Sequence, residues 1–234
     1  MRGSRVGFKR NIFRSGAYIR HFNPDSADNP FYRIYQQKRR DTIEIIGERQ
    51  GDEMILDVGG GMGRIALAVE KRNSRKRVVL MDIGADMLRL AAGRHDALGR
   101  VMATNADAHA LPFRAHSFDG IIGLDVLCHL ENPPAALREF HRVLRPQGTL
   151  ILDNTNGNPL WVLFYPKYLG KNPLNWLRIM RFHGVYPGWQ EIVRHYRKKA
   201  FISLLRENGF RPTKSLSYGP LVCPKWHLVV CARV

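Results

Sequence analysis

A glycine-rich stretch that follows a short apolar run is the first candidate for chemistry in this 234-residue chain. Asp57 closes the apolar run, and Gly59, Gly60, Gly61 and Gly63 lead into a helical segment. Glycine lets the backbone adopt left-handed dihedrals and approach a ligand that a side chain would obstruct. We therefore expect a ligand at a strand-to-helix turn, with the Asp57 carboxylate beside it.

A second acid follows about 20 residues after the loop, at the spacing typical of a nucleoside-binding carboxylate. Asp82 ends the next apolar run, and there it can accept both hydroxyls of a ribose. The competing ligand is a dinucleotide, whose pyrophosphate binds at the same kind of loop. Because Asp57 would repel a phosphate and attract an amino group, the two acids favour S-adenosylmethionine.

An alternation of strands and helices must position these acids. It predicts βαβ units and a parallel sheet that is covered on both faces. A last helix and two closing strands follow a region that breaks the alternation. We expect strands at 54–58, 77–82, 101–104, 118–124, 149–153, 213–217 and 226–232, and helices at 31–50, 64–72, 86–98, 133–144 and 198–208.

Five segments within residues 54–153 together form a recognisable pattern: 55–63, 80–83, 105–113, 117–122 and 140–150. They resemble the first motif, the ribose-binding acid, the adenine-contacting segment, the fourth strand and the following helix, turn and strand of the class I S-adenosylmethionine-dependent methyltransferases. The subgroup that the chain resembles contains the ubiquinone and menaquinone methyltransferases and many small-molecule methyltransferases. The resemblance implies an α/β fold: a Rossmann-like, doubly wound sheet of seven mostly parallel strands with a C-terminal antiparallel strand pair.

The resemblance also implies roles around the cofactor. The glycine loop and Asp57 would surround the methionine part, and Asp82 would hold the ribose. Ile83 and Met87 would pack on the adenine. Asp107 would accept a hydrogen bond from the adenine amino group, and the Ala108 backbone N–H would donate to the ring. A core role for Met87 and a turn role for Asp107 are the alternatives.

The acceptor side is expected at the end of the fourth strand, where the resemblance places Leu124 and Asp125 beside the sulfonium. A base is needed only where the acceptor must lose a proton. His129 follows this strand and is the candidate catalytic residue, with a structural histidine as the alternative. Asp125 could also hold a hard cation together with Asp153 and Asn154. The rest of the chain does not resemble the metal-dependent catechol type, so we expect no metal.

The regions outside the resemblance suggest the domain organisation. Residues 1–29 form a basic arm, and residues 30–234 form the methyltransferase domain. Residues 157–196, after the fifth strand, are rich in aromatic, proline and basic residues. Aromatic side chains supply flat apolar walls, so this insertion is expected to be a lid over a lipophilic or aromatic acceptor. An insertion that completes the hydrophobic core is the alternative.

The charge balance suggests acidic partners. The formal net charge is +17 and the sequence pI is about 10.4, which favours nucleic acid, an anionic membrane surface or an acidic small molecule. The alternative is a basic surface that is simply solvated and binds no acidic partner. We expect a small-molecule acceptor with peripheral membrane association, and keep two alternatives: a nucleic-acid methyltransferase or binder, and a cofactor-binding scaffold subunit. Three scattered cysteines suit a reducing cytoplasm.

Overall fold

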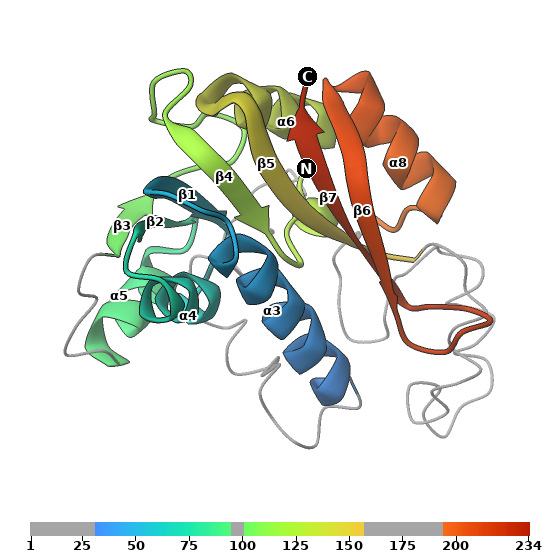
Figure 1. Cartoon of the computed structure of the whole chain (residues 1–234), viewed down its shortest axis with the longest axis horizontal. Helices are drawn as coiled ribbons and strands as arrows, with labels where there is room; N and C mark the ends of the chain where they lie inside the picture. The colour runs from blue at the N-terminus through green and yellow to red at the C-terminus, as the bar shows by residue number, and fades with distance from the viewer. Residues whose placement is uncertain (1–30, 95–100, 157–193) are drawn as a thin grey trace, which may run out of the picture.

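The computed structural model describes residues 31–94, 101–156 and 194–234. They form a seven-stranded sheet in the order β3-β2-β1-β4-β5-β7-β6 (Figure 1). The strands are β1 (Glu53–Val58), β2 (Lys76–Asp82), β3 (Met102–Asn105), β4 (Phe118–Gly123), β5 (Leu144–Thr155), β6 (Phe210–Tyr218) and β7 (Trp226–Arg233). The helices are α3 (Tyr32–Gly47), α4 (Arg64–Arg72), α5 (Ala85–Arg94), α6 (Pro133–Val143) and α8 (Lys198–Glu207), with a short 3₁₀ helix, η1 (Leu127–His129).

The strand directions confirm the expected doubly wound sheet. Strands β1 to β5 are parallel to one another, whereas β7 runs antiparallel to both β5 and β6. The strand order reverses between β1 and β4, which are adjacent in the sheet. In sheets of this kind, ligands bind outside the carboxyl ends of the strands at such a reversal.

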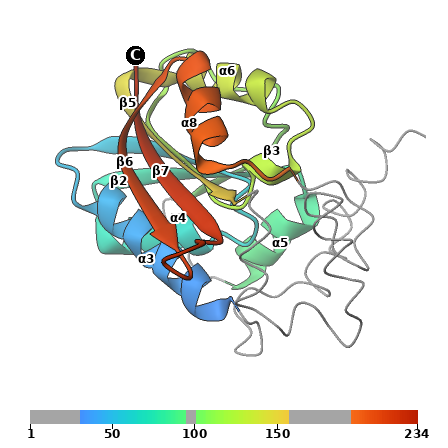
Figure 2. The same ribbon diagram turned by 90° about the vertical axis from the view of Figure 1, so that its right-hand side faces the viewer.

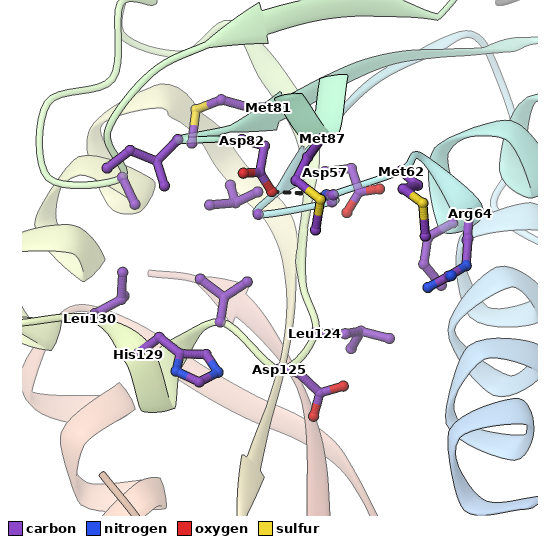
Figure 3. A pocket seen from close by; sticks show the side chains of 18 of the residues that line it. Asp57, Met62, Arg64, Met81, Asp82, Met87, Leu124, Asp125, His129 and Leu130 are labelled. Atoms are coloured by element: carbon purple, nitrogen blue, oxygen red, sulfur yellow. Dashed lines mark hydrogen bonds between the residues drawn. The ribbon is translucent and has the colours of Figure 1, made fainter. Parts of the chain in front are cut away.

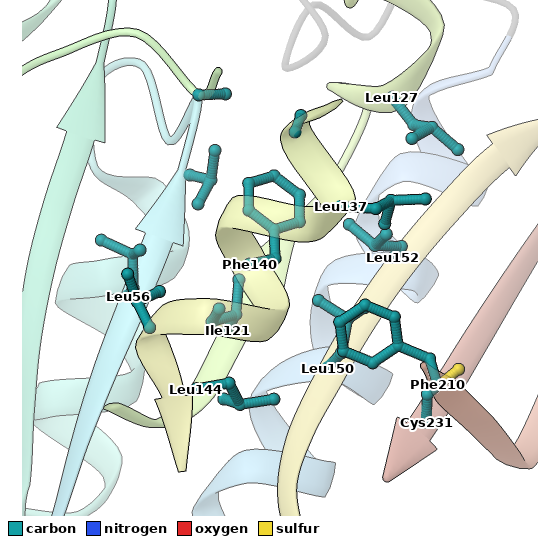
Figure 4. Close-up of a cluster of buried hydrophobic side chains, with 14 of the residues drawn as sticks. Leu56, Ile121, Leu127, Leu137, Phe140, Leu144, Leu150, Leu152, Phe210 and Cys231 are labelled. Atoms are coloured by element: carbon teal, nitrogen blue, oxygen red, sulfur yellow. The ribbon is translucent and has the colours of Figure 1, made fainter. Parts of the chain in front are cut away.

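Two hydrophobic layers cover the sheet, one on each face. Successive strand residues point to opposite faces. Ile55 of β1 therefore packs in the cluster that includes α3, α4 and α5 residues, and Leu56 packs in the other. Figure 4 shows the second layer, where Leu137 and Phe140 of α6 lie over the sheet. Figure 2 shows α8 on the same side as α6, with α3, α4 and α5 on the other side.

Helix α3 packs on the sheet through one buried stripe. Tyr35, Lys38, Thr42 and Ile46 recur at intervals of three and four residues and are all buried. This is the spacing of one helix face. A lysine in the middle of that stripe requires a buried partner, since a charged group is rarely buried unless it is paired.

The element boundaries agree with the sequence prediction except at a few ends. Strand β5 begins at Leu144 and not at residue 149, because Leu144 already pairs with Phe118 across an irregularity in the β4–β5 register. Gln147 has a positive φ of 62° within this irregular stretch, as a bulge allows.

Some predictions fall outside the described residues, namely the basic arm 1–29, most of the insertion 157–196 and the end of the predicted helix 86–98. Among the described helices, none is long and apolar enough to cross a membrane.

Candidate active site

A cavity of about 270 Å³ lies at the carboxyl ends of β1, β2 and β4, where the strand order reverses (Figure 3). Its lining includes every site residue predicted from the sequence except Gly63. The predicted residues that line it are Asp57, Gly59, Gly60, Gly61, Asp82, Ile83, Met87, Asp107, Ala108, Leu124, Asp125 and His129. Residues that are up to 72 positions apart in the chain thus meet in one site.

The loop between β1 and α4 requires glycine for its conformation. Gly59, Gly61 and Gly63 have φ angles of 63°, 55° and 73°, in the left-handed region. A Cβ on Gly59 would also lie 2.5 Å from Cγ2 of Val126, which no side chain can tolerate without a shift. Gly63 is the N-cap residue of α4 and lies outside the cavity lining, so its part is to start the helix.

Asp57 presents a buried carboxylate to this loop. The residue is 2% exposed, and its Oδ2 accepts no hydrogen bond from the described part of the chain. Burial raises the pKa of Asp57 to about 7, a backbone hydrogen bond from Ala66 opposes that rise, and the charge of Asp82 adds to it. A buried acceptor normally has a partner, so an oxygen of this kind at a cavity fits a cationic group of a ligand.

Asp82 fixes the loop from the neighbouring strand. Its Oδ2 accepts from the Gly61 N–H at 2.9 Å, drawn as the dashed line in Figure 3, and its Oδ1 accepts from the Gly84 N–H at 2.7 Å. Burial raises the pKa of this carboxyl, and the two backbone donors limit the rise. An ionised carboxylate has about four lone-pair sites, so Asp82 retains capacity for hydroxyl donors of a ligand.

The next strand ends with the predicted adenine-contacting segment. Oδ1 of Asp107 accepts from the His109 backbone N–H at 2.9 Å and lies 2.7 Å from Nδ1 of the same histidine. Met87 is only 8% exposed, yet it lines the cavity, so it belongs both to the core and to the site. Ile83 and Ala108 complete this end of the lining.

The opposite wall comes from the segment after β4. Figure 3 shows Leu124, Asp125 and His129 on one side of the cavity, and Asp57, Asp82 and Met87 on the other. Asp125 has a φ of 56°, an uncommon conformation for a residue that is not glycine. His129 ends η1 directly after this turn. The cavity therefore has two walls. The first carries Asp57 and Asp82, and the second carries Asp125 and His129.

Lys38 of α3 links Asp125, on the second wall, to Asp153 of β5. The site predicted from the sequence did not include this lysine. Its Nζ lies 2.9 Å from Oδ1 of Asp125 and also forms an ion pair with Asp153. The Asp125 backbone N–H donates to Oδ1 of Asp153 at 2.6 Å. Burial alone would lower the pKa of Lys38, but the two carboxylates outweigh it and raise that pKa. Burial and the nearby Asp125 raise the pKa of Asp153, and the ammonium opposes the rise.

This arrangement bears on the cation site that the sequence suggested at the ends of β4 and β5. The cation between Asp125 and Asp153 is the ammonium of Lys38, and Asn154 exchanges two hydrogen bonds with the Tyr196 backbone. Among the described residues, no cluster of three or more acidic, histidine or cysteine side chains has the geometry of a metal site. A metal at this place would have to displace Lys38.

Helix α3 and the loop contribute further lining residues that the sequence prediction missed. Tyr35, Lys38 and Arg39 reach the cavity from α3, and Met62 and Arg64 reach it from the start of α4. One signal was present in the sequence: Lys38 interrupts an otherwise uncharged stripe of the helix. A lysine at such a position indicates a buried acidic partner, although it does not say which one.

The fold and this cavity define the class of protein. A glycine loop after β1, an acid at the end of β2 and a reversed strand β7 are the features of class I methyltransferases expected from the sequence. A family model described as "Methyltransferase domain" matches residues 56–152.

Curated relatives and solved structures agree with this class. A ubiquinone/menaquinone biosynthesis C-methyltransferase UbiE from Ectopseudomonas mendocina is 35% identical over 166 residues, which cover 67% of this chain and 62% of the relative. Its namesake from Hydrogenovibrio crunogenus is 34% identical over 125 residues, which cover 52% and 49%. The chain thus spans about half to three-fifths of the length of these relatives.

Solved structures show the same fold at low identity. The magnesium protoporphyrin IX methyltransferase from Synechocystis PCC 6803 with bound SAH has a TM-score of 0.69 at 17% identity, covering 97% of this chain and 99% of that one. A SAM-dependent methyltransferase from Methanosarcina mazei has a TM-score of 0.64 at 22% identity, covering 82% and 97%. The [4+2]-cyclase SpnF has a TM-score of 0.62 at 19% identity, covering 85% and 81%. The chain belongs to the class I S-adenosylmethionine-dependent methyltransferases, whose cofactor is S-adenosylmethionine.

Proposed function

We propose that this protein transfers the methyl group of S-adenosylmethionine to a small lipophilic or aromatic acceptor. The observation that carries the proposal is the unpaired Oδ2 of Asp57, a buried carboxyl oxygen at the glycine loop of a cavity that Asp82 also lines. A dinucleotide would bring a phosphate to the same loop and meet repulsion. A ligand with an ammonium group and a ribose has a partner for each of these two carboxylates.

The cofactor-binding roles follow from the positions in the cavity. Asp57 would receive the ammonium of the methionine part, with the loop glycines letting the backbone come close to it. Asp82 would accept the ribose hydroxyls with the lone pairs that Gly61 and Gly84 leave available. Gly63 would act only through the start of α4.

The adenine would lie at the end of the site formed by Ile83, Met87, Asp107 and Ala108. Ile83 and Met87 supply apolar surface for the ring. Asp107 would accept from the amino group, and its contact with His109 fixes the direction of its carboxylate. The Ala108 backbone N–H would donate to a ring nitrogen.

The reaction itself needs little covalent chemistry from the protein. The bound cofactor supplies a methyl group that is already activated by its sulfonium. Catalysis then consists mainly in aligning the acceptor in a water-poor cavity, which can lower the barrier by several kcal/mol. Leu124 and Asp125 would border the methyl group, and His129 would accept a proton where the acceptor must lose one.

The acceptor class is supported by the names of the relatives. Ubiquinone and menaquinone precursors are aromatic lipids, so a substituted hydroquinone is the first acceptor to test. One solved structure with this fold is named a [4+2]-cyclase, so the fold alone does not imply methyl transfer. The test must therefore detect a methylated product and not only cofactor binding. The basic composition supports a nucleic-acid acceptor as the second candidate.

The test is detection of a labelled product. The purified protein would be incubated with S-[methyl-¹³C]adenosylmethionine and either alkyl-substituted hydroquinones or total RNA, and the products analysed by mass spectrometry. We expect label in a hydroquinone, little label with His129→Gln, and unchanged binding of S-adenosylhomocysteine by that variant. Label in RNA would favour the second candidate. Binding of S-adenosylhomocysteine with no label in either acceptor would favour the scaffold alternative.

A further inference from the structure

The turn between β6 and β7 exposes two adjacent aliphatic side chains. Leu221 is 99% exposed and Val222 is 89% exposed, the highest values among the large apolar residues of the described chain. Single exposed apolar residues are normal on protein surfaces. Two neighbours at the tip of a turn, almost wholly in solvent, form a small protruding apolar surface.

The turn that carries Leu221 and Val222 is hydrogen-bonded to the residue that follows β5. The Asn156 backbone N–H donates to the Lys225 carbonyl at 2.6 Å, and its side-chain Nδ2 donates to the Pro224 carbonyl at 2.7 Å. Within the turn, the Cys223 N–H donates to the Pro220 carbonyl at 3.1 Å. Leu221 and Val222 therefore lie on a turn whose flanking residues are fixed by hydrogen bonds.

A group of exposed basic residues is attached to the same strand end. Asn156 forms an isolated parallel bridge with Tyr196, and the Asn154 side chain donates to the Tyr196 carbonyl at 2.7 Å. Around Tyr196, at the start of α8, the exposed residues are Arg194, Arg197, Lys198 and Lys199. Asn156 thus contacts both the segment with the apolar tip and the segment with the basic group.

Both features lie at the edge of the sheet where the cavity is located. Thr155, at the carboxyl end of β5, pairs with Trp226, which directly follows the turn. Strands β1 and β4 run parallel to β5, so their carboxyl ends and the cavity lie at this edge as well. The Arg194 guanidinium donates to the carbonyl of Glu131 at 2.7 Å, and Glu131 lines the cavity.

We propose that this docking edge binds the surface of an anionic lipid bilayer. It is defined as Leu221 and Val222 together with Arg194, Arg197, Lys198 and Lys199. The aliphatic pair would enter the region between headgroups and acyl chains, while the basic residues would meet the anionic headgroups. The inference rests on the proposed function, because it brings the cavity next to the phase in which a lipophilic acceptor is dissolved.

A membrane fits these side chains better than other occupants. Nucleic-acid sites for single strands use aromatic residues on which bases stack, and the tip carries none. Two aliphatic residues are a small fraction of the 20 to 30 residues per side that a stable protein interface needs. A bilayer requires only a shallow apolar anchor beside positive charge, and the net charge of +17 agrees with an anionic surface.

Sedimentation with phospholipid vesicles tests the proposal on the full chain. The vesicles would be pure phosphatidylcholine, or phosphatidylcholine mixed with the anionic lipid phosphatidylglycerol, because basic segments are attracted to anionic lipid surfaces. We expect binding to the anionic vesicles only. Leu221→Ser/Val222→Ser and Lys198→Gln/Lys199→Gln should each weaken binding about tenfold.

A matched control is Arg206→Gln/Arg211→Gln. It removes the same charge from exposed residues at the opposite edge, where Phe210 pairs with Arg233, and should change vesicle binding less than about twofold. Equal losses in the two charge variants would overturn the proposal, because binding would then follow net charge alone. So would an unchanged affinity of the tip variant, or concentration-dependent dimers that the tip variant abolishes without vesicles.

S-adenosylhomocysteine binding separates this inference from the proposed function. Calorimetry should give the same affinity for the wild type and all three variants. If the protein binds the cofactor and transfers the methyl group but does not bind anionic vesicles, only the proposal that the docking edge binds lipid is wrong. If the wild-type protein does not bind S-adenosylhomocysteine at all, the proposed function is wrong.

Discussion

Lys38 and Asp153 form an ion pair in which both side chains are only 1% exposed. The same ammonium binds Asp125, so one cation serves two carboxylates from the ends of β4 and β5. Nζ also lies 5.0 Å from the Tyr35 ring centroid and 5.1 Å from that of Trp226. This cluster attaches α3 to the wall of the cavity that carries Asp125.

Replacing Lys38 should therefore destabilise the protein in a pH-dependent way. Lys38→Met leaves the buried carboxylate of Asp153 and the partly exposed carboxylate of Asp125 without their cation. Loss of the partner of a buried charge typically costs about 3–5 kcal/mol. Without the ammonium, the pKa of Asp153 rises further, so this carboxyl takes up a proton as the pH falls and loses its charge. The deficit in free energy of unfolding should be larger at pH 8 than at pH 5, as urea denaturation can measure.

Lys76 provides a matched control for this substitution. It is also buried, and its Nζ binds Glu53 at 2.8 Å and the Arg49 carbonyl at 2.7 Å, at the amino end of β2 and away from the cavity lining. Lys76→Met should lose comparable stability but retain the affinity for S-adenosylhomocysteine, whereas Lys38→Met should lose about tenfold. Equal affinities for the two variants would show that Lys38 is purely structural.

Asp57 predicts a pH dependence of cofactor binding. Its pKa of about 7 means that the free protein carries the protonated carboxyl below neutral pH. A cationic ligand binds the ionised form, so binding below pH 7 releases a proton. The affinity for S-adenosylhomocysteine should rise about tenfold from pH 6 to pH 8 and then level off. Calorimetry in buffers of different ionisation enthalpy would count the protons, and Asp57→Asn should bind weakly with no such rise.

The same carboxyl should lower the stability of the ligand-free protein at high pH. The pKa of Asp57 is raised on folding from 3.8 to about 7, so the unfolded chain ionises first and stability falls as the pH rises through that interval. Asp57→Asn lacks this loss. Relative to wild type, its free energy of unfolding should be about 3 kcal/mol more favourable at pH 8 than at pH 5.

Asp82 should be needed both for the loop and for the ligand. Asp82→Ala removes the acceptor of the Gly61 and Gly84 N–H groups, and would also remove the proposed ribose contact. We expect at least a 100-fold loss of affinity for S-adenosylhomocysteine, since hydrogen bonds to a charged group contribute about 1.5–3 kcal/mol each. Asp86→Ala, which removes only an exposed ion pair with Arg89, should bind within about twofold of wild type.

Local patterns in the sequence predicted the wall of the cavity that carries Asp57 and Asp82. Asp57 and Asp82 each follow an apolar strand, and parallel strands bring their carboxyl ends to one edge, so two acids 25 positions apart had to be neighbours. The left-handed φ angles of the loop were likewise expected from its glycines. These inferences needed only the periodicity of nearby residues.

The contacts of α3 could not be predicted in this way. Lys38 and Asp153 are 115 positions apart, and their pairing depends on where the helix docks on the sheet. The sequence predicts too late a start for β5 because Pro146 and Gly148 indicate a turn, whereas pairing with β4 already begins at Leu144, before that turn. The acceptor lid at 157–196 and the basic arm remain predictions, as they fall almost wholly outside the described residues.

Gly59 tests whether the loop serves the ligand or only the packing. Gly59→Ala introduces a left-handed strain of about 1–2 kcal/mol and a contact of 2.5 Å with Val126. We expect a marked loss of stability and a loss of affinity for S-adenosylhomocysteine of more than about 100-fold, because the methyl group would hold the backbone away from the ligand.

Two companions separate these effects. Gly51 has a φ of 88° with open space around its Cβ direction, so Gly51→Ala should show the strain alone and bind the ligand normally. Adding Val126→Ala to Gly59→Ala removes the side-chain contact and should restore part of the stability. The affinity should remain low in the double variant if the loop approaches the ligand. If the affinity returned with the stability, the glycine would be required for packing against Val126, and the proposed cofactor contact of the loop would be wrong.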